Sequence, residues 1–447
     1  MRRDDHSNGD LQLTGKIQGS VTRAALWSLR RLNDRRARRA SAAGAGGDTG
    51  TVRILLHHAY GMGGTIRTVL NLAGYLARER DVEIVSVVRT AEAPFLPIPP
   101  GVRVSFLDDR ITARGPAARL LSRFPSMLVL KQENIHHTVS LWTDLRLIRR
   151  LRAMRGGVVI TTRPAYNLAA ALFAPPEVIT IGQEHVTLQV HKPEMRRLIK
   201  RRYGRLDAFV TLTEADLEQY AGLLKADAPR RLTSIPNAVP RLAGDVSRLE
   251  EKVAVAIGRV VHAKGFDRLV RAWRQVAQAH PDWTLRIYGG GTPEREQRLR
   301  DRIEEAGLTG GVLLMDSSRE IGVELAKASI YVVSSRYEGF GMTILEAMSK
   351  GVPVVSFDCP HGPREIITHE HDGLLVRAGN ADALAGGIRR LIEDEELRRT
   401  LGGNALRTAA RYDLDTVGAR WDALLADLSG PSGRPDPQPC SLGTPVF

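Results

Sequence analysis

The chain has 447 residues, of which 43% are hydrophobic and 26% charged, a composition that excludes a disordered or fibrous protein. At ~100–200 residues per domain, this length predicts two or three domains. No stretch reaches the ~18–20 continuous apolar residues that span a bilayer, and the polar start has no apolar signal core, so we expect a cytoplasmic protein. The net charge of +14 predicts anionic partners. With only Cys359 and Cys440 present, a disulfide framework and a cysteine zinc site are excluded.

Residues 1–49 are predicted to form a basic tail. The ten basic and five acidic residues of segment 1–48 contribute +5 to the net charge. Within it, residues 16–39 interleave Leu and Trp with Arg, which on a helix would place an apolar stripe beside a basic face. Such a helix suits an anionic membrane surface. A disordered, solvated tail is the alternative reading of the same residues.

Short apolar runs rich in β-branched residues alternate with helical patterns through the middle of the chain. Strands are expected at 52–58, 82–88, 102–107, 158–162, 178–181, 208–212, 253–257, 284–288, 312–315, 330–334 and 353–356. Helical patterns include 66–78, 266–278, 293–306, 381–392, 396–411 and 413–428. This alternation predicts parallel sheets with helices on both faces. Because so many strands exceed one compact sheet, we predict an α/β protein of two doubly wound, Rossmann-like domains.

The domain boundaries follow from changes in composition. We predict an N-terminal Rossmann-like domain over 50–235, a linker over 236–251 and a C-terminal Rossmann-like domain over 252–411. Residues 412–428 are expected to form a helix that crosses back to the first domain. The Pro-, Gly- and Ser-rich segment 429–447 is predicted to be a disordered tail.

Two loops follow predicted strands and open predicted helices. The first, GMGGT, contains Gly63 and Gly64, which let the backbone approach a ligand beside unpaired helix N–H groups. The second, GRVVHAKGF, contains Arg259 and Lys264, which could both reach a diphosphate. Each pattern alone is also compatible with a structural turn or with solvated surface cations. Their place after strands is where open α/β sheets bind ligands.

A third segment, SSRYEGFGMTILEAM, joins a strand to a helix that is expected to start near Met342. The N-terminal amides of that helix favour a phosphate. Glu346 lies one turn in, and its side chain leans towards the N-terminus of the helix. A carboxylate beside phosphates is useful when it accepts hydrogen bonds from hydroxyls, so Glu338 and Glu346 could each bind a pair of sugar or ribose hydroxyls. A surface Glu and a helix-capping Glu are the simpler alternatives.

Together these segments resemble family 4 glycosyltransferases of the GT-B fold. The resemblance rests on Glu338-x7-Glu346 within EGFGMTILEAM, on GRVVHAKGF, on SIPNAV before it and on GMGGT, in the family's order. It covers roughly residues 52 to 428, and it implies that domain 50–235 is the acceptor-side domain and that domain 252–411 binds the nucleotide sugar. The later segment CPHGPREII, at 359–367, further resembles members that build bacterial cell-surface polysaccharides.

The resemblance implies a role for each matching position. Glu346 is similar to the residue that binds the ribose hydroxyls, and Glu338 to the one that contacts hydroxyls of the donor sugar. Arg259 and Lys264 resemble the pair that neutralises the donor diphosphate where a metal would otherwise serve. The remaining matches are donor-loop residues Phe340, Gly341, Met342 and Thr343, the N-domain turn Gly63 and Gly64, and His185, which resembles the histidine near the reacting sugar. The family often has Pro where this chain has Thr343.

The implied activity is that of a retaining, metal-independent hexosyltransferase that uses a UDP-sugar and no cofactor. Asp413 and Asp415 fit the D-x-D pattern of metal-dependent transferases, but they open a predicted helix, where Asp is a natural N-cap. We therefore predict capping rather than metal binding at this position. The expected acceptor is a saccharide, lipid-linked or wall-polymer hydroxyl.

The sequence is also compatible with two other functions and with a contact to the cell membrane. A nucleotide-sugar epimerase shares the fold, and a non-catalytic basic binding protein would explain the charge. Nucleic acid is not an expected partner, because the chain has no RNA or DNA motif and little base-stacking capacity. The basic stretch 196–202, on a predicted N-domain helix, could act with 16–39 to hold the enzyme on the inner face of the cell membrane. A solvated helix face is its alternative.

Overall fold

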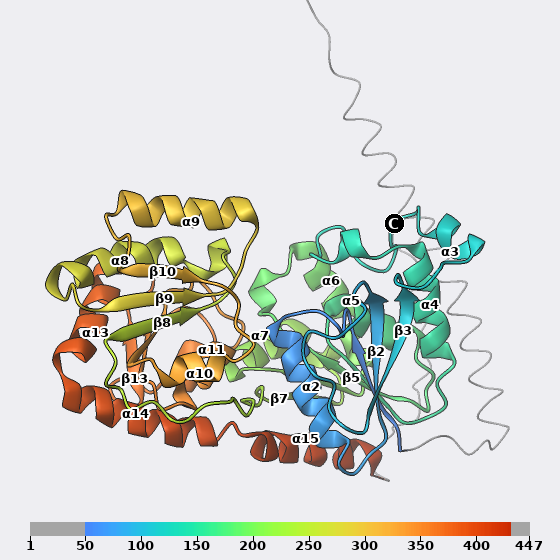
Figure 1. Cartoon of the computed structure of the whole chain (residues 1–447). Coiled ribbons are helices and arrows are strands. Elements are labelled where there is room, and N and C mark those ends of the chain that lie inside the picture. The colour runs from blue at the N-terminus through green and yellow to red at the C-terminus, as the bar shows by residue number, and fades with distance from the viewer. Residues whose placement is uncertain (1–49, 431–447) are drawn as a thin grey trace, which may run out of the picture.

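The computed structural model describes residues 50–430, which fold into two α/β lobes lying side by side (Figure 1). The predicted membrane-contacting segment 16–39 and nearly all of the tail predicted at 429–447 lie outside the described residues. Among residues 50–430, no helix is both long and apolar enough to cross a membrane.

The first lobe, which we call the N-domain, is built on a seven-stranded parallel sheet with the order β3-β2-β1-β4-β5-β6-β7. Its strands are β1 (Val52–Leu56), β2 (Val82–Arg89), β3 (Val102–Asp109), β4 (Val158–Thr161), β5 (Ile179–Gln183), β6 (Ala208–Thr211) and β7 (Arg231–Ser234). In the interior strand β1, Val52 lies opposite Val82 of β2 on one side and Val158 of β4 on the other. The central strands are buried apolar runs because helices cover both faces of the sheet.

The N-domain helices are α2 (Gly64–Leu76), α3 (Pro116–Leu121), α4 (Leu141–Arg152), α5 (Pro164–Phe173), α6 (Pro193–Arg202) and α7 (Glu214–Leu224). Two apolar clusters pack on the sheet. One contains Leu151, Phe173 and Phe209, and the other contains Val69, Leu76 and Ile160. Their burial fixes the sheet between two helical layers, which leaves its carboxyl edge free to carry polar side chains.

The second lobe, the C-domain, has a six-stranded parallel sheet with the order β10-β9-β8-β11-β12-β13. Its strands are β8 (Val253–Ile257), β9 (Thr284–Tyr288), β10 (Val312–Met315), β11 (Ile330–Val333), β12 (Val354–Phe357) and β13 (Gly373–Val376). Its helices are α8 (Phe266–Ala279), α9 (Pro293–Glu305), α10 (Ile321–Ala326), α11 (Met342–Met348), α12 (Pro363–Ile366), α13 (Ala381–Glu393) and α14 (Glu395–Ala410). A short 3-10 turn, η5 (His262–Lys264), precedes α8.

After the C-domain, helix α15 (Leu414–Ser429) returns to the N-domain and packs on α2 (Figure 1). Trp421 is buried in the N-domain cluster, and Tyr75 of α2 donates a hydrogen bond to Asp422 at 2.7 Å. Asp413 caps α15, with its side chain accepting from the Thr416 amide at 2.6 Å. The predicted capping role of Asp413 is confirmed.

The predicted fold class is confirmed, and every expected strand is present with ends shifted by at most two residues. Two strands that the sequence did not predict are β7 and β13, each at an edge of its sheet. The first has the half-polar sequence RLTS and the second begins with a glycine. Edge strands are shielded on fewer sides, so they do not require the continuous apolar run that marks a central strand.

Candidate active site

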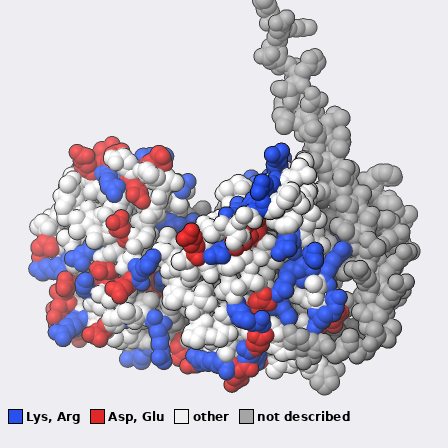
Figure 2. Space-filling model, turned by 45° about the vertical axis from the view of Figure 1, so that its right-hand side comes forward, with Lys and Arg blue, Asp and Glu red and all other residues white. Residues whose placement is uncertain are grey.

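A cavity of about 460 Å³ lies between the two domains, where loops follow the carboxyl ends of strands in both sheets. Figure 2 shows the molecule hollowed between its lobes, with Lys and Arg side chains gathered on the N-domain side. Every site residue predicted from the sequence lines this one cavity. They are Gly63, Gly64, His185, Arg259, Lys264, Glu338, Phe340, Gly341, Met342, Thr343 and Glu346.

The loop between β8 and α8 forms one wall of the cavity. Arg259 is exposed there, and Lys264 ends the η5 turn. Gly265 follows with a φ of 65°, and a Cβ at this position would lie 2.1 Å from the Ser334 carbonyl oxygen. Glycine therefore allows the η5 loop to pack directly against the end of β11, which brings Lys264 beside the loop that carries Glu338.

The loop between β11 and α11 forms the adjacent wall. Lys264 Nζ lies 2.6 Å from Glu338 Oε1, which also accepts a hydrogen bond from Ser335 Oγ at 2.6 Å. Arg336 fixes the same loop by donating to Asp267 of α8 at 2.6 and 2.8 Å. The predicted diphosphate cation and the predicted sugar-binding carboxylate are thus ion-paired with each other. A bound diphosphate would need to share or replace that pairing.

Glu346 lies on α11 and is buried, with a side chain that is 6% exposed and faces the N-domain. Its Oε1 accepts a hydrogen bond from Arg67 Nη1 of α2 at 2.8 Å, across the two domains. Burial raises the pKa of Glu346 above its ordinary value, while the charge of Arg67 opposes that rise. Arg67 was not predicted as a site residue, because a single Arg inside an amphipathic helix has no sequence signature.

The N-domain contributes the turn before α2 and the end of β5. A Cβ at Gly63 or Gly64 would meet nothing within 4 Å, so the backbone there is open to a ligand. His185 is half-buried, and its buried Nε2 atom has no hydrogen-bond partner. Burial, with a smaller contribution from Arg163, lowers the pKa of His185 to about 3, so the imidazole is neutral at pH 7. A neutral, unpartnered ring nitrogen can donate to or accept from a sugar hydroxyl.

A polar cluster at the carboxyl edge of the N-domain sheet continues away from His185. His57 follows β1 and Arg163 follows β4, and β4 lies between β1 and β5 in the sheet. His57 binds the Tyr166 hydroxyl at 2.7 Å through Nδ1, and burial, with Arg163 next, lowers the pKa of His57 to about 3. Burial, with Glu184 next, raises the pKa of Glu133 to about 7. Neither Arg163 nor Glu133 was predicted, because they come from distant loops.

On the C-domain side, the cavity extends past β9 and β10. Its further lining there consists of Tyr288, Gly289, Gly290, Ser317, Ser318 and Ile321. None of these was predicted. The sequence could have indicated them only by their positions, because they lie at or after the ends of strands at the same sheet edge as Arg259.

The basic residues at 196–202 lie on α6, where Arg197, Lys200 and Arg201 are exposed. Arg196 instead donates to the backbone oxygens of His191 and Gln189, each at 2.8 Å. Three solvent-facing cations on one short helix leave both predicted readings, membrane contact and a solvated face, compatible with the fold.

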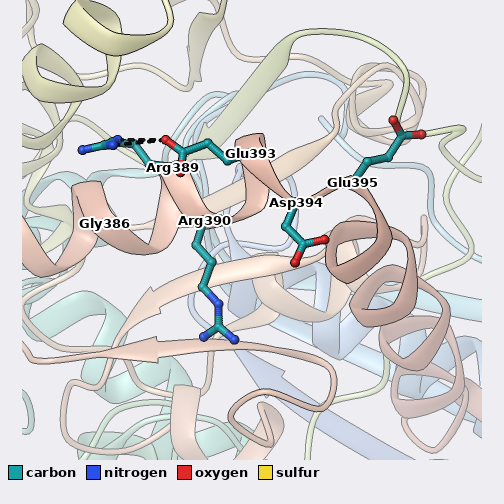
Figure 3. Close-up of a pocket in the computed structure, with 6 residues that line it drawn as sticks. All are labelled: Gly386, Arg389, Arg390, Glu393, Asp394 and Glu395. Carbon is teal, nitrogen blue, oxygen red and sulfur yellow. Dashed lines mark hydrogen bonds and ion pairs between the residues drawn. The ribbon is translucent and has the colours of Figure 1, made fainter.

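A second hollow, of about 600 Å³, lies on the C-domain near α13 and the start of α14 (Figure 3). Arg389 is paired there with Glu393 at 3.1 Å, and Arg390 with Glu370. The other two charged residues there also have partners, because Asp394 caps α14 and Glu395 pairs with Arg399. In the interdomain cavity, by contrast, His185 Nε2 and Asn237 Oδ1 have no hydrogen-bond partner.

Residues 244–408 match the family described as glycosyl transferases group 1. An exopolysaccharide phosphotransferase of Streptomyces coelicolor is 36% identical over 390 residues, which cover 84% of this chain but 40% of that protein. The amylovoran biosynthesis glycosyltransferase AmsD of Erwinia amylovora is 25% identical, over 83% of this chain and 98% of AmsD.

Among solved structures, TarM of S. aureus in complex with fondaparinux, alpha-GlcNAc-glycerol and UDP is similar, with a TM-score of 0.68 at 15% identity. The match covers 85% of this chain and 100% of that chain. The chain therefore has the two-domain GT-B fold, and its residues 244–408 match the glycosyl transferases group 1 family.

Proposed function

We propose that the protein is a glycosyltransferase that moves a hexosyl group from a UDP-sugar to a hydroxyl of a saccharide, lipid-linked or wall-polymer acceptor. The observation that carries this proposal is that one interdomain cavity is lined by Arg259, Lys264, Glu338 and Glu346 together with Gly63 and Gly64. Two cations suit a diphosphate, and two carboxylates suit the hydroxyls of a ribose and a sugar. The fold and the family match of the C-domain support the same reaction.

In this proposal, chemistry occurs at the bond between the anomeric carbon and the diphosphate oxygen. Negative charge grows on the diphosphate as that bond breaks. Arg259, Lys264 and the open amides at Gly64 stabilise it, because preorganised donors act most strongly where charge develops. These cations do the work that a metal ion would do elsewhere, so we propose metal-independent transfer. Retention at the anomeric carbon is proposed from the family 4 resemblance.

The acceptor enters from the N-domain side of the cavity in this scheme. His185 and, beyond it, His57 supply neutral imidazoles for a polar acceptor, and Arg163 supplies a positive charge. The similarity to proteins named as an exopolysaccharide phosphotransferase and as an amylovoran biosynthesis glycosyltransferase favours a cell-surface polysaccharide. We propose a location at the inner face of the cell membrane, with the exposed cations of α6 and the segment 16–39 meeting anionic lipid.

Product analysis tests the proposal and separates it from its rivals. With a nucleoside diphosphate sugar and an acceptor, sugar transfer breaks the anomeric C–O bond and releases the nucleoside diphosphate. Transfer of the sugar phosphate, the chemistry suggested by the name of the Streptomyces relative, breaks the diphosphate linkage and releases the monophosphate. An epimerase would isomerise the donor without any acceptor.

We expect diphosphate release that requires both the acceptor and Lys264. Monophosphate release, or isomerisation alone, would contradict the proposal. A binding protein would give steeply salt-dependent association with RNA and no response of its melting temperature to nucleotide sugars.

A further inference from the structure

The segment Cys359–Ile367, which we call the brace, lies between the donor loop and an N-domain helix. It follows β12 and contains α12. Its residues touch α7 of the N-domain on one side and the loop Glu338–Gly341 on the other, as the contacts below describe. The proposed reaction gives this segment, whose sequence is CPHGPREII, no chemical role.

Glu365 of the brace caps α7 from the other domain. Its Oε2 accepts a hydrogen bond from the Glu214 amide at 2.8 Å, and its Oε1 accepts one from the Ala215 amide at 3.1 Å. The third free amide of the helix, that of Asp216, donates to Thr213 Oγ1 at 3.2 Å. The first turn of α7 is therefore fully capped only when the two domains are in this arrangement. A carboxylate at a helix N-terminus is also favoured by the helix dipole.

His361 adds a second contact to the same helix turn. Its side chain is buried, with Nδ1 3.7 Å from Asp216 Oδ1 and Nε2 3.2 Å from Gln219 Nε2. The backbone of His361 has a φ of 64°, a left-handed conformation that is unfavourable for a residue with a side chain. The packing of the interdomain joint must supply the energy that maintains it.

The opposite side of the brace is packed against the donor loop. Gly362 has a φ of 69°, and a Cβ there would lie 2.4 Å from the Phe340 carbonyl oxygen. Ile366 Cδ1 would lie 3.5 Å from a Cβ on Gly341. Cys359 is fully buried, and its pKa is raised to about 12 by burial and then by the charge of Glu338. A shift of the brace would therefore displace the loop that carries Glu338.

We propose that the brace couples the interdomain angle to the donor loop, with Glu365 as a positioning residue that acts through the cap on α7. The role in donor binding rests on the function proposed above, whereas the effect on the interdomain angle does not. When the domains are apart, the two α7 amides lose their carboxylate and the brace loses its N-domain support. Donor binding, which needs groups from both domains, then becomes weaker because fewer molecules are in the binding arrangement.

The interdomain angle can be measured without any activity. Spin labels at Glu194→Cys on α6 and Arg298→Cys on α9 would report the distance across the cleft, since both positions are exposed on helices at its mouth (Figure 1). The full chain would carry Cys440→Ser, and the buried Cys359 would stay. Glu365→Ala is the test variant. Glu370→Ala is the matched control, because Glu370 is exposed and pairs with Arg390 within the C-domain.

We expect Glu365→Ala to lengthen and broaden the distribution of distances between the labels. The ratio of closed to open molecules should fall about fivefold, which corresponds to the free energy of one lost helix cap. UDP affinity and the donor KM should change by a similar factor, with kcat changed less. Glu365→Gln keeps one acceptor oxygen, so its ratio of closed to open molecules should lie between those of the wild type and Glu365→Ala. It replaces Glu365→Ala as the test variant if that protein does not fold. An unchanged distribution in folded Glu365→Ala or Glu365→Gln, or an equal change in Glu370→Ala, would overturn the proposal. If the wild-type protein binds no nucleotide, the proposed function fails while the distance measurement still decides the role of the brace.

Discussion

Replacing Lys264 by Ala should weaken binding of a nucleoside diphosphate without affecting binding of the nucleoside. The Lys264 side chain is 22% exposed, and its Nζ lies 2.6 Å from Glu338 Oε1, at the wall of the interdomain cavity. A hydrogen bond to a charged group is worth about 2 kcal/mol, which corresponds to a loss of about 30-fold in affinity. Removing Lys264 also leaves Glu338 without its cation, so the repulsion of the diphosphate adds to this loss.

Isothermal titration calorimetry with UDP and with uridine would measure the effect directly. Uridine has no phosphate, so its dissociation constant should stay within about twofold of the wild-type value, well under the ~1 kcal/mol of a typical hydrogen bond. Lys252→Ala is a suitable control, because Lys252 is exposed and pairs with Asp282 on the surface of the C-domain. Equal weakening for UDP and uridine would mean that the substitution damages the cavity as a whole. No weakening for either would refute the role of Lys264 at the diphosphate.

Three further substitutions test two buried carboxyl groups and the packing of α15 on α2. Arg67→Ala removes the cation beside the buried Glu346, and it should lower the free energy of unfolding, measured with urea, by about 1–3 kcal/mol. The loss should be larger at pH 8 than at pH 5, because the unpaired, buried carboxyl group resists ionisation. Burial raises the pKa of Glu133 to about 7. The stability that the protonated carboxyl group contributes to the fold is therefore fully present below the ordinary pKa of about 4.3 and is lost as the pH rises through 7. Glu133→Gln should therefore exceed the wild type by up to ~3 kcal/mol at pH 8 and equal it at pH 4; equal stability at both pH values would contradict the buried carboxyl. Gly418→Ala places a Cβ 2.3 Å from the Tyr75 ring, so it should separate α15 from α2 and lower the free energy of unfolding by about 1–3 kcal/mol. Gly403→Ala is the control: its Cβ would meet nothing within 4 Å, so it should leave the stability unchanged in the same urea assay.

Much of the C-domain wall could be predicted from the sequence because its chemistry is carried by local segments. Lys264 and Glu338 each follow a strand of one parallel sheet, and the carboxyl ends of parallel strands meet at one edge. Two loops that are far apart in the chain therefore come together without any knowledge of tertiary contacts. The same rule placed Gly63 and Gly64 at the facing edge of the N-domain sheet.

The contacts between the domains could not be predicted, since they depend on how two separately folded sheets are oriented. The pairing of Arg67 with Glu346 joins positions that are 279 residues apart in the chain and lie in different domains. The cap that Glu365 places on α7 also joins the two domains. A charged residue on a helix face gives the same sequence pattern whether it meets solvent or another domain. The edge strand β7 was missed for a related reason, because its half-polar sequence RLTS is marked as a strand only by the ladder with β6.

The central claim is that the interdomain cavity holds a nucleoside diphosphate sugar, and a crystal structure of the full chain with UDP tests it most directly. The account predicts the diphosphate within hydrogen-bond distance of Lys264 and Arg259, and the ribose hydroxyls at Glu346, with the pairing of Lys264 and Glu338 opened or shared. UDP bound elsewhere on the molecule, or seated in this cavity with its phosphates away from both cations, would contradict it.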